Sequence, residues 1–169
     1  MENAFPGLIV ITILLLAVLT LGQTSLATQS AVLESWRGME ERLGDRARTN
    51  LSSVHAETSV GGTSVEVTLQ NDGNTKLADF ERWDVIVQYH QSGGGYAQEW
   101  LQYDELGGTN KWMANFLEGT IGTFEPRILN PGEQMVIQIS LDPAVAMTTT
   151  NLVTIATPNG ISASAIFTR

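Results

Sequence analysis

The residue types that perform most enzyme and metal chemistry are scarce in this sequence. Its 169 residues include no cysteine, which excludes disulfide scaffolds, thiol enzymes, zinc fingers and thiolate-held iron–sulfur clusters. The two histidines, His55 and His90, are far apart in the sequence, and no Gly-x-Ser-x-Gly motif accompanies them. We therefore predict no catalytic residues and no cofactor, and we interpret the chain as a protein that is not an enzyme.

A weak calcium-loop pattern occurs at Asn71-Asp72-Gly73-Asn74-Thr75. The alternating acidic ligands and the closing bidentate glutamate of a calcium loop are missing, so the main interpretation is a simple turn. A weak cation site formed by nearby carboxylates stays open as the alternative. Its candidate ligands are Asp79, Glu81 and Asp84.

Two further features have both a functional and a structural interpretation. The segment Asn50-Leu51-Ser52 is an N-glycosylation sequon, which makes Asn50 a candidate glycan acceptor. Trp83, Trp100 and Trp112 could line a sugar groove, but packing in a core or between subunits is the interpretation we favour.

Charge is distributed very unevenly along the chain. The net charge is −9, and a chain this acidic lacks the clustered Lys and Arg that bind nucleic acid. No charged residue occurs between Glu2 and Glu34, whereas five basic residues face thirteen acidic ones after residue 49, a net charge of −8. The sequence therefore predicts two parts, an apolar region at 1–49 and an acidic domain at 50–169.

The apolar region predicts one long helix from about Phe5 to about Ala47. Residues 4–26 meet the length of about 20 mostly apolar residues that a membrane span needs. A removable secretory signal is disfavoured because such signals begin with basic residues, and the first basic residue here is Arg37. Further along, apolar residues recur at helical spacing beside charged ones, which indicates that an amphipathic helix continues the apolar one.

The acidic domain predicts short strands with alternating apolar residues, separated by turns rich in Gly, Asn and Pro. This pattern is typical of an all-β, immunoglobulin-like sandwich, so the predicted fold class is α+β: a long hydrophobic helix followed by this sandwich. The predicted strands are Val54–Val60, Thr63–Gln70, Asp84–His90, Ala97–Tyr103, Lys111–Leu117, Gln134–Leu141, Asn151–Thr157 and Ile161–Thr168.

Several segments resemble archaellins, the subunits of the archaeal swimming filament within the type IV pilin superfamily. Members of that family have a pilin-like N-terminal helix and an immunoglobulin-like sandwich. They are made with a short basic leader, which is not seen here, so we expect either that residue 1 is the mature start or that processing differs. The matching segments are Phe5–Ile11, Val67–Leu77, Phe80, Asp84–Tyr89, Ile128–Glu133 and Thr157–Ile161.

The resemblance implies a structural subunit of an extracellular helical filament at the cell surface, formed by copies of this chain. The membrane would hold the helix before assembly, and an archaellum-type basal motor or platform would be a further partner. Nucleic acid would not be one. The helix residues expected in the subunit interface are Leu8, Ile9, Val10, Ile11, Ile13, Leu14, Leu15, Leu16, Val18, Leu19, Leu21, Leu26, Leu33 and Trp36.

Two other functions stay open at this point. The same design serves adhesive type IV-like pili, and it also suits a membrane-anchored accessory protein of the archaellum or the envelope that does not polymerise. A resident span favours basic flanking residues and aromatic residues at both ends. Only Phe5 and Trp36 flank this apolar run, which favours burial among neighbouring helices.

Overall fold

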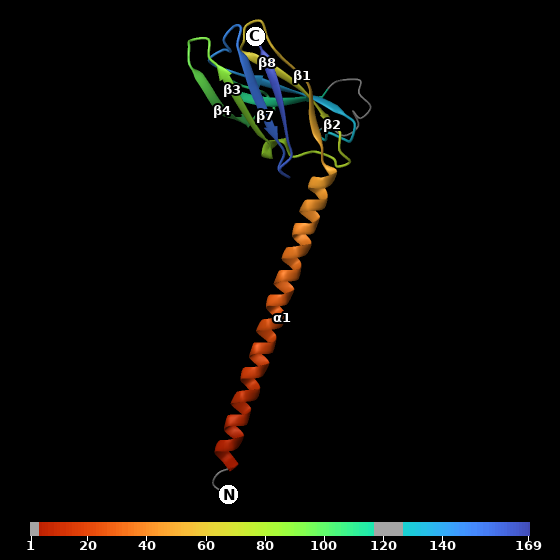
Figure 1. The fold of residues 1–169 in the computed structure, drawn as a ribbon, viewed down its shortest axis with the longest axis vertical. Coiled ribbons are helices and arrows are strands. Elements are labelled where there is room, and N and C mark those ends of the chain that lie inside the picture. The colour runs from red at the N-terminus through yellow and green to blue at the C-terminus, as the bar shows by residue number, and fades with distance from the viewer. Residues whose placement is uncertain (1–3, 117–126) are drawn as a thin grey trace. The chain divides into compact units, whose positions relative to one another are not determined.

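The computed structural model describes residues 4–116 and 127–169 as one long helix followed by eight strands (Figure 1). Contacts within the chain divide it into two units, Met1–Leu43 and Gly44–Arg169. The last turn of the helix therefore belongs to the unit that contains the strands.

Helix α1 spans Ala4–Arg48, which confirms the long helix expected from the sequence. Its threonines do not interrupt it, because their hydroxyls donate to the carbonyl four residues earlier, as at Thr12 to Leu8 (2.8 Å) and Thr24 to Thr20 (2.7 Å). Arg46 and Arg48 lie in the last turn, where positive charge suits the negative end of the helix dipole.

The strands form two antiparallel sheets with the order β1-β2-β6-β5 and β4-β3-β7-β8. These strand orders are those of the two sheets in an immunoglobulin-like sandwich, so the predicted fold class is confirmed. A short parallel pairing of β4 with β5 joins the sheets on one side, and Ser53 of β1 donates to the Ser164 carbonyl of β8 (2.8 Å) on the other. The strands are β1 (Leu51–Thr58), β2 (Ser64–Asn71), β3 (Asp84–His90), β4 (Tyr96–Tyr103), β5 (Lys111–Phe116), β6 (Gln134–Ser140), β7 (Thr150–Ala156) and β8 (Ser162–Thr168).

The core lies between the two sheets and consists of the alternating apolar residues that identified the strands. Val67 of β2 faces Ile137 of β6 across the ladder, and both are fully buried. Trp83 and Trp112 belong to this core, whereas Trp100 is exposed, so the packing interpretation is confirmed for two of the three tryptophans. A short 3-10 helix, Phe80–Arg82, precedes β3 and buries Phe80.

The first strand differs from the prediction: it spans Leu51–Thr58 and not Val54–Val60. A β-bulge between Ser53 and His55 interrupts the alternation of inward and outward side chains and leaves Val54 exposed. The periodic pattern from which strands are predicted is therefore broken at the start of this strand. The other strands agree with the prediction to within one residue at the ends that the structure describes. Leu117, the predicted end of β5, lies outside the described residues.

Two neighbouring residues of β6 provide a test of this core. Ile137→Ala removes a fully buried side chain and should lower the free energy of unfolding by about 2–5 kcal/mol. Val136→Ala, on the opposite face of the same strand, should cost clearly less. Urea unfolding of the full-length chain in detergent, followed by tryptophan fluorescence, measures both, and equal losses would contradict the assigned faces.

Candidate functional site

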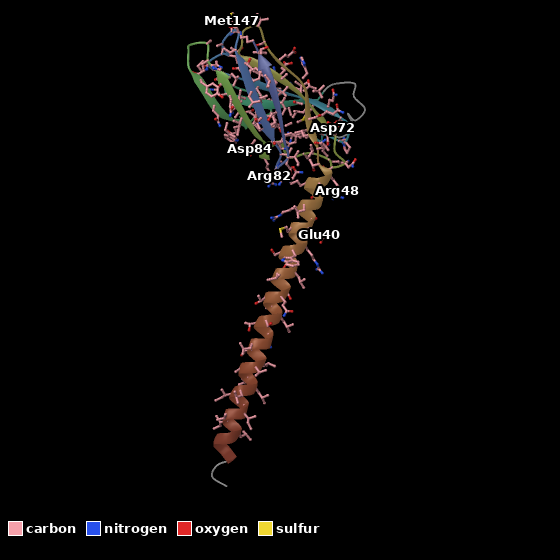
Figure 2. All side chains as sticks on the ribbon, viewed as in Figure 1. Glu40, Arg48, Asp72, Arg82, Asp84 and Met147 are labelled. Carbon is pink, nitrogen blue, oxygen red and sulfur yellow. The ribbon has the colours of Figure 1, made fainter. Side chains whose placement is uncertain are left out.

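Along residues 7–43, the surface of α1 is not covered by any other described part of the chain. Every residue from Gly7 to Leu43 is exposed except Gly38, which is intermediate. The fourteen predicted interface residues, from Leu8 to Trp36, each expose 56–70% of their area. Figure 2 shows the side chains of the helix projecting on all sides of its ribbon. The structure therefore leaves all of these residues available to a partner.

An apolar surface of this length can be kept from water by lipid or by other protein. The helix satisfies the length and composition of a membrane span, with a mean hydropathy of 2.2 over its most apolar window, none of which is buried. Because its backbone bonds are made within the helix, lipid and neighbouring helices are both physically acceptable surroundings. The helix can therefore pass from one to the other without unfolding.

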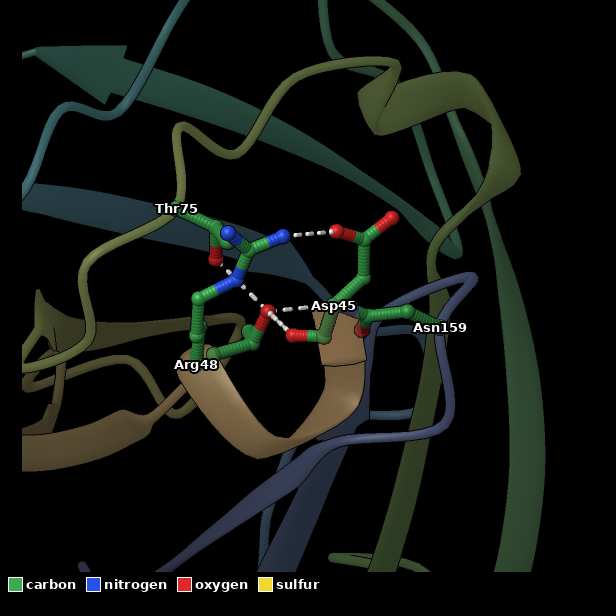
Figure 3. Close-up of polar contacts among 5 residues, drawn as sticks. Asp45, Arg48, Thr75 and Asn159 are labelled. Carbon is green, nitrogen blue, oxygen red and sulfur yellow. Dashed lines mark hydrogen bonds and ion pairs between the residues drawn. The ribbon is translucent and has the colours of Figure 1, made fainter. Parts of the chain in front are cut away.

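The C-terminal turn of α1 is held by hydrogen bonds that converge on Thr49. Figure 3 shows the labelled residues Asp45, Thr75 and Asn159 around this point. The Thr49 hydroxyl donates to the Asp45 carbonyl (2.7 Å), lies 2.6 Å from the Thr75 hydroxyl, and accepts from the Asn159 amide (2.8 Å). Arg48 makes an ion pair with Asp45 on the exposed side of this turn (2.9 Å). Thr49 is buried, and these contacts use the full hydrogen-bonding capacity of its hydroxyl.

The loop Asn71–Thr75 supplies the remaining partners of the helix end. The Asn74 N–H donates to the Arg48 carbonyl (2.7 Å), and the Gly73 N–H donates to the Asn50 carbonyl (3.1 Å). These bonds satisfy carbonyls that have no partner within the helix. The side chain of Asn71, which is fully buried, accepts from the Gly73 N–H (3.1 Å) and donates to the Thr75 carbonyl (2.8 Å). The loop is a series of bends, and its backbone N–H groups cap the helix end.

Gly73 is required in this loop because it lies against the backbone of the helix end and leaves no room for a side chain. A Cβ atom added there would come within 2.4 Å of the Asn50 nitrogen and 2.6 Å of the Arg48 oxygen. Neither of these backbone atoms can move without breaking the helix cap. We name Thr49, Asn71–Thr75 and Asn159 the helix-end cap.

The sequon lies beside the helix-end cap. Asn50 is exposed, whereas its neighbours Thr49 and Leu51 are buried, and the Ser52 hydroxyl donates to Asp72. An exposed asparagine is compatible with a glycan, and its modification stays a prediction.

The structure does not bring the three candidate cation ligands together as a metal site. The carboxylate of Asp84 accepts a hydrogen bond from the indole N–H of Trp100 (2.9 Å). Asp79 and Glu81 instead line an open cavity of about 310 Å³, together with Arg82 and Arg127. Within residues 4–116 and 127–169, no three His, Asp or Glu side chains are grouped so that they could hold a metal ion.

Two groups near this cavity have shifted pKa values. A hydrogen bond from Lys111, supported by the Leu106 N–H, lowers the pKa of Asp104. Burial raises the pKa of Tyr103, although Arg127 opposes the shift. Both shifts keep each group in its ordinary form at neutral pH, Asp104 ionised and Tyr103 protonated, so neither group is prepared for proton transfer.

No protein-family model matches the sequence, and no curated protein matches it. Solved structures do. The archaellum periplasmic stator protein FlaG from Sulfolobus acidocaldarius matches with a TM-score of 0.54 and 23% identity, over 70% of this chain and 99% of that chain. The complex of FlaF and FlaG from the same organism matches with a TM-score of 0.53 and 23% identity, over 69% of this chain and 87% of that chain.

A second kind of structure matches over nearly the whole length. The archaeal flagellum of Methanospirillum hungatei strain JF1 matches with a TM-score of 0.52 and 14% identity, over 96% of this chain and 92% of that chain. The chain has the fold of archaellum proteins. The resemblance to archaellins noted in the sequence is thus confirmed at the level of the fold. The match to the flagellum covers 96% of this chain, so it must include most of α1. The match to FlaG covers 70% of this chain, which is about the share of the chain that follows α1.

The sequence did not identify the helix-end cap. Asn159 lies in the turn between β7 and β8, and Thr49 lies at the boundary between the two predicted parts of the chain, so neither position suggests a contact with the other. One available signal was an Asn-Asp-Gly-Asn-Thr loop, which is rich in short polar side chains that bond to nearby backbone. That signal identifies a turn but not the distant backbone that the turn contacts.

Gly73→Ala tests the close approach within the helix-end cap. The added methyl group would overlap backbone atoms of Asn50 and Arg48, so the free energy of unfolding should fall by about 1–3 kcal/mol. Gly93→Ala is the matched control, because no atom lies within 4 Å of its added Cβ. Thermal unfolding of both variants in detergent measures the difference. An unchanged Gly73→Ala variant would contradict the described contact.

Thr49→Val tests the hydrogen bonds of the same cap. Valine keeps the shape but leaves the Asn159 amide and the Thr75 hydroxyl without this acceptor, so the loss should be about 1–3 kcal/mol. Thr68→Val, on the outer face of β2, should change stability by less than about 0.5 kcal/mol. Hydrogen exchange of the Asn74 amide gives a local readout, because its protection should fall in Thr49→Val alone.

Proposed function

We propose that this chain is a structural subunit of an archaellum-type filament and polymerises through the apolar surface of α1. The observation that carries the proposal is the exposure of every large apolar side chain from Leu8 to Leu21 in a chain whose strands already form a complete core. In the proposed filament, neighbouring copies of α1 cover one another. The membrane holds the helix before assembly, and the finished filament lies outside the cell.

The free energy available from this burial is large. Eleven large aliphatic side chains lie within residues 8–21, and each contributes about 1.5–3 kcal/mol when it is fully buried, roughly 15–30 kcal/mol per subunit in total. Losses of translational, rotational and side-chain freedom oppose this gain. Identical subunits related by a rotation that does not close form a helical polymer, so one repeated contact is sufficient.

The match to the Methanospirillum hungatei flagellum supports the filament proposal in particular, because it includes most of α1. In the proposed filament the subunit converts no energy. It would be turned by a motor at the cell envelope and would transmit torque. The same filament could equally well serve in adhesion.

A second function is favoured by a different observation. The stator protein FlaG is 23% identical to this chain, against 14% for the flagellum, and is matched over 99% of its own length. On that analogy, the strand unit would act in the envelope, and α1 would stay in the membrane as an anchor without forming a polymer. The two functions differ in what covers α1, which is lipid in one and other copies of α1 in the other.

Leu15→Asp tests whether α1 is buried in an apolar environment. An unpaired carboxylate is strongly unfavourable among packed helices, so filaments should be lost while the strand unit stays folded. Negative-stain microscopy of fibres sheared from cells shows the loss, and Leu15→Met, which conserves volume, is the matched control and should leave filaments intact. Normal filaments from Leu15→Asp would overturn the proposal.

Leu15→Ala separates the two proposed functions. Alanine stays apolar enough for membrane insertion but leaves a cavity among packed helices, which typically costs 2–5 kcal/mol at a fully packed site. For a filament subunit, the membrane level of the chain should be unchanged while filaments become shorter or dissociate at lower temperature. For a membrane anchor, the membrane level of the chain should again be unchanged, but neither the parent nor Leu15→Ala should form fibres that contain the chain.

A further inference from the structure

The outer face of the second sheet carries an apolar band that crosses all four of its strands. Ile86 of β3 lies opposite Trp100 of β4, and Leu152 of β7 lies opposite Ile166 of β8. The two pairs are diagonal neighbours, because Ile86 pairs with Thr154 and Gln88 pairs with Leu152. In Figure 1 the strands β4, β3, β7 and β8 lie next to one another in this sheet.

The side chains at the two ends of the band, on β4 and β8, are exposed to solvent. Trp100 exposes 59% of its area and Ile166 exposes 67%, while Tyr96, near the end of the same face, exposes 59%. Ile86 and Leu152, between them, are half-buried. The side chains around the band are neutral glutamines, threonines and serines: Gln88, Gln98, Thr154 and Ser164.

This face is also nearly free of charge. Its four strands contain no lysine or arginine and two carboxylates, Asp84 and Glu99. Glu99 pairs with the inward-facing Val87 and accepts from the Tyr89 hydroxyl (3.3 Å), so it does not lie on the outer face. Asp84 lies at the edge, where it accepts the Trp100 indole N–H. The other sheet differs, because Glu57 and Glu66 lie directly opposite each other on its outer face and are both exposed.

We propose that this neutral face is a contact surface for a second copy of this chain. Residues after 49 carry a net charge of −8, so two copies repel each other wherever their carboxylates approach. A face whose one carboxylate, Asp84, lies at its edge adds little to that repulsion, whichever surface of the neighbouring copy it meets. A basic partner, in contrast, would be attracted to the acidic loops and to the Glu57–Glu66 side.

The size of the face also favours a second copy as the occupant. Four strands of about seven residues cover roughly 450 Å² of sheet plane. Stable interfaces between freely diffusing proteins bury about 800 Å² on each partner, so this face alone is too small for one. Copies already held together through α1 have a high effective concentration, and a small contact is then sufficient. This inference rests on the proposed filament, in which the contact is heterologous, so the face meets a different surface of the neighbouring copy.

The absence of cysteine allows a direct test in the full-length chain. Ile166→Cys and, as the matched control, Glu66→Cys each introduce a single exposed thiol, on the outer faces of the two different sheets. Labelling with a hydrophilic maleimide should be at least tenfold slower in assembled fibres than in detergent-dispersed chain for Ile166→Cys, and should change less than threefold for Glu66→Cys. Equal labelling in both states, or equal protection of both thiols, would overturn the proposal.

A photo-crosslinker attached at the Ile166→Cys thiol identifies what lies on the face. Products at whole multiples of the chain's mass support a second copy, because in a heterologous contact each copy can be crosslinked to the next. A product at any other mass assigns the face to a different protein and overturns the proposal. Should the parent chain form no fibres, the filament proposal fails by itself. The same crosslinking in native membranes then still decides the sheet contact: double-mass products support it, and uncrosslinked chain contradicts it.

Discussion

The hydrophobic effect acting on α1 is the interaction on which the other features of this protein depend. A helix that is apolar on all sides from Leu8 to Leu21 cannot remain in water, and the strands offer it no place because their core is already filled. Its burial must therefore come from outside the chain. Lipid and other copies of the helix are the two surroundings that satisfy both its side chains and its internally bonded backbone.

The strand unit does not need this helix to form its core, and it supplies hydrogen-bond partners to the helix end. Its sandwich has its own core, and its acidic surface keeps the exposed part hydrated. The helix-end cap supplies hydrogen-bond partners to the last turn of α1, so the chain passes from helix to β1 with the carbonyls of Arg48 and Asn50 satisfied. One nearly neutral sheet face interrupts the acidic surface.

Most of the fold could be predicted from the sequence because periodicity reports directly on burial. The alternation at Val65, Val67 and Leu69 located β2, and the unbroken apolar run located α1. Prediction was wrong at the start of β1, where a bulge breaks the alternation, and it did not find the helix-end cap, because the contact of Asn159 with Thr49 joins residues 110 positions apart. The apolar band was also missed, since Ile86, Trp100, Leu152 and Ile166 become one surface only when the strand order is known. No pattern in one strand contains that information.

The most direct measurement of what covers α1 is a helical reconstruction by electron cryomicroscopy of fibres sheared from cells that produce this chain. The account predicts fibres built from this chain alone, with copies of α1 packed together along the axis and the strand units outside. Fibres that lack this chain, together with single copies of it in the membrane fraction surrounded by lipid, would contradict it.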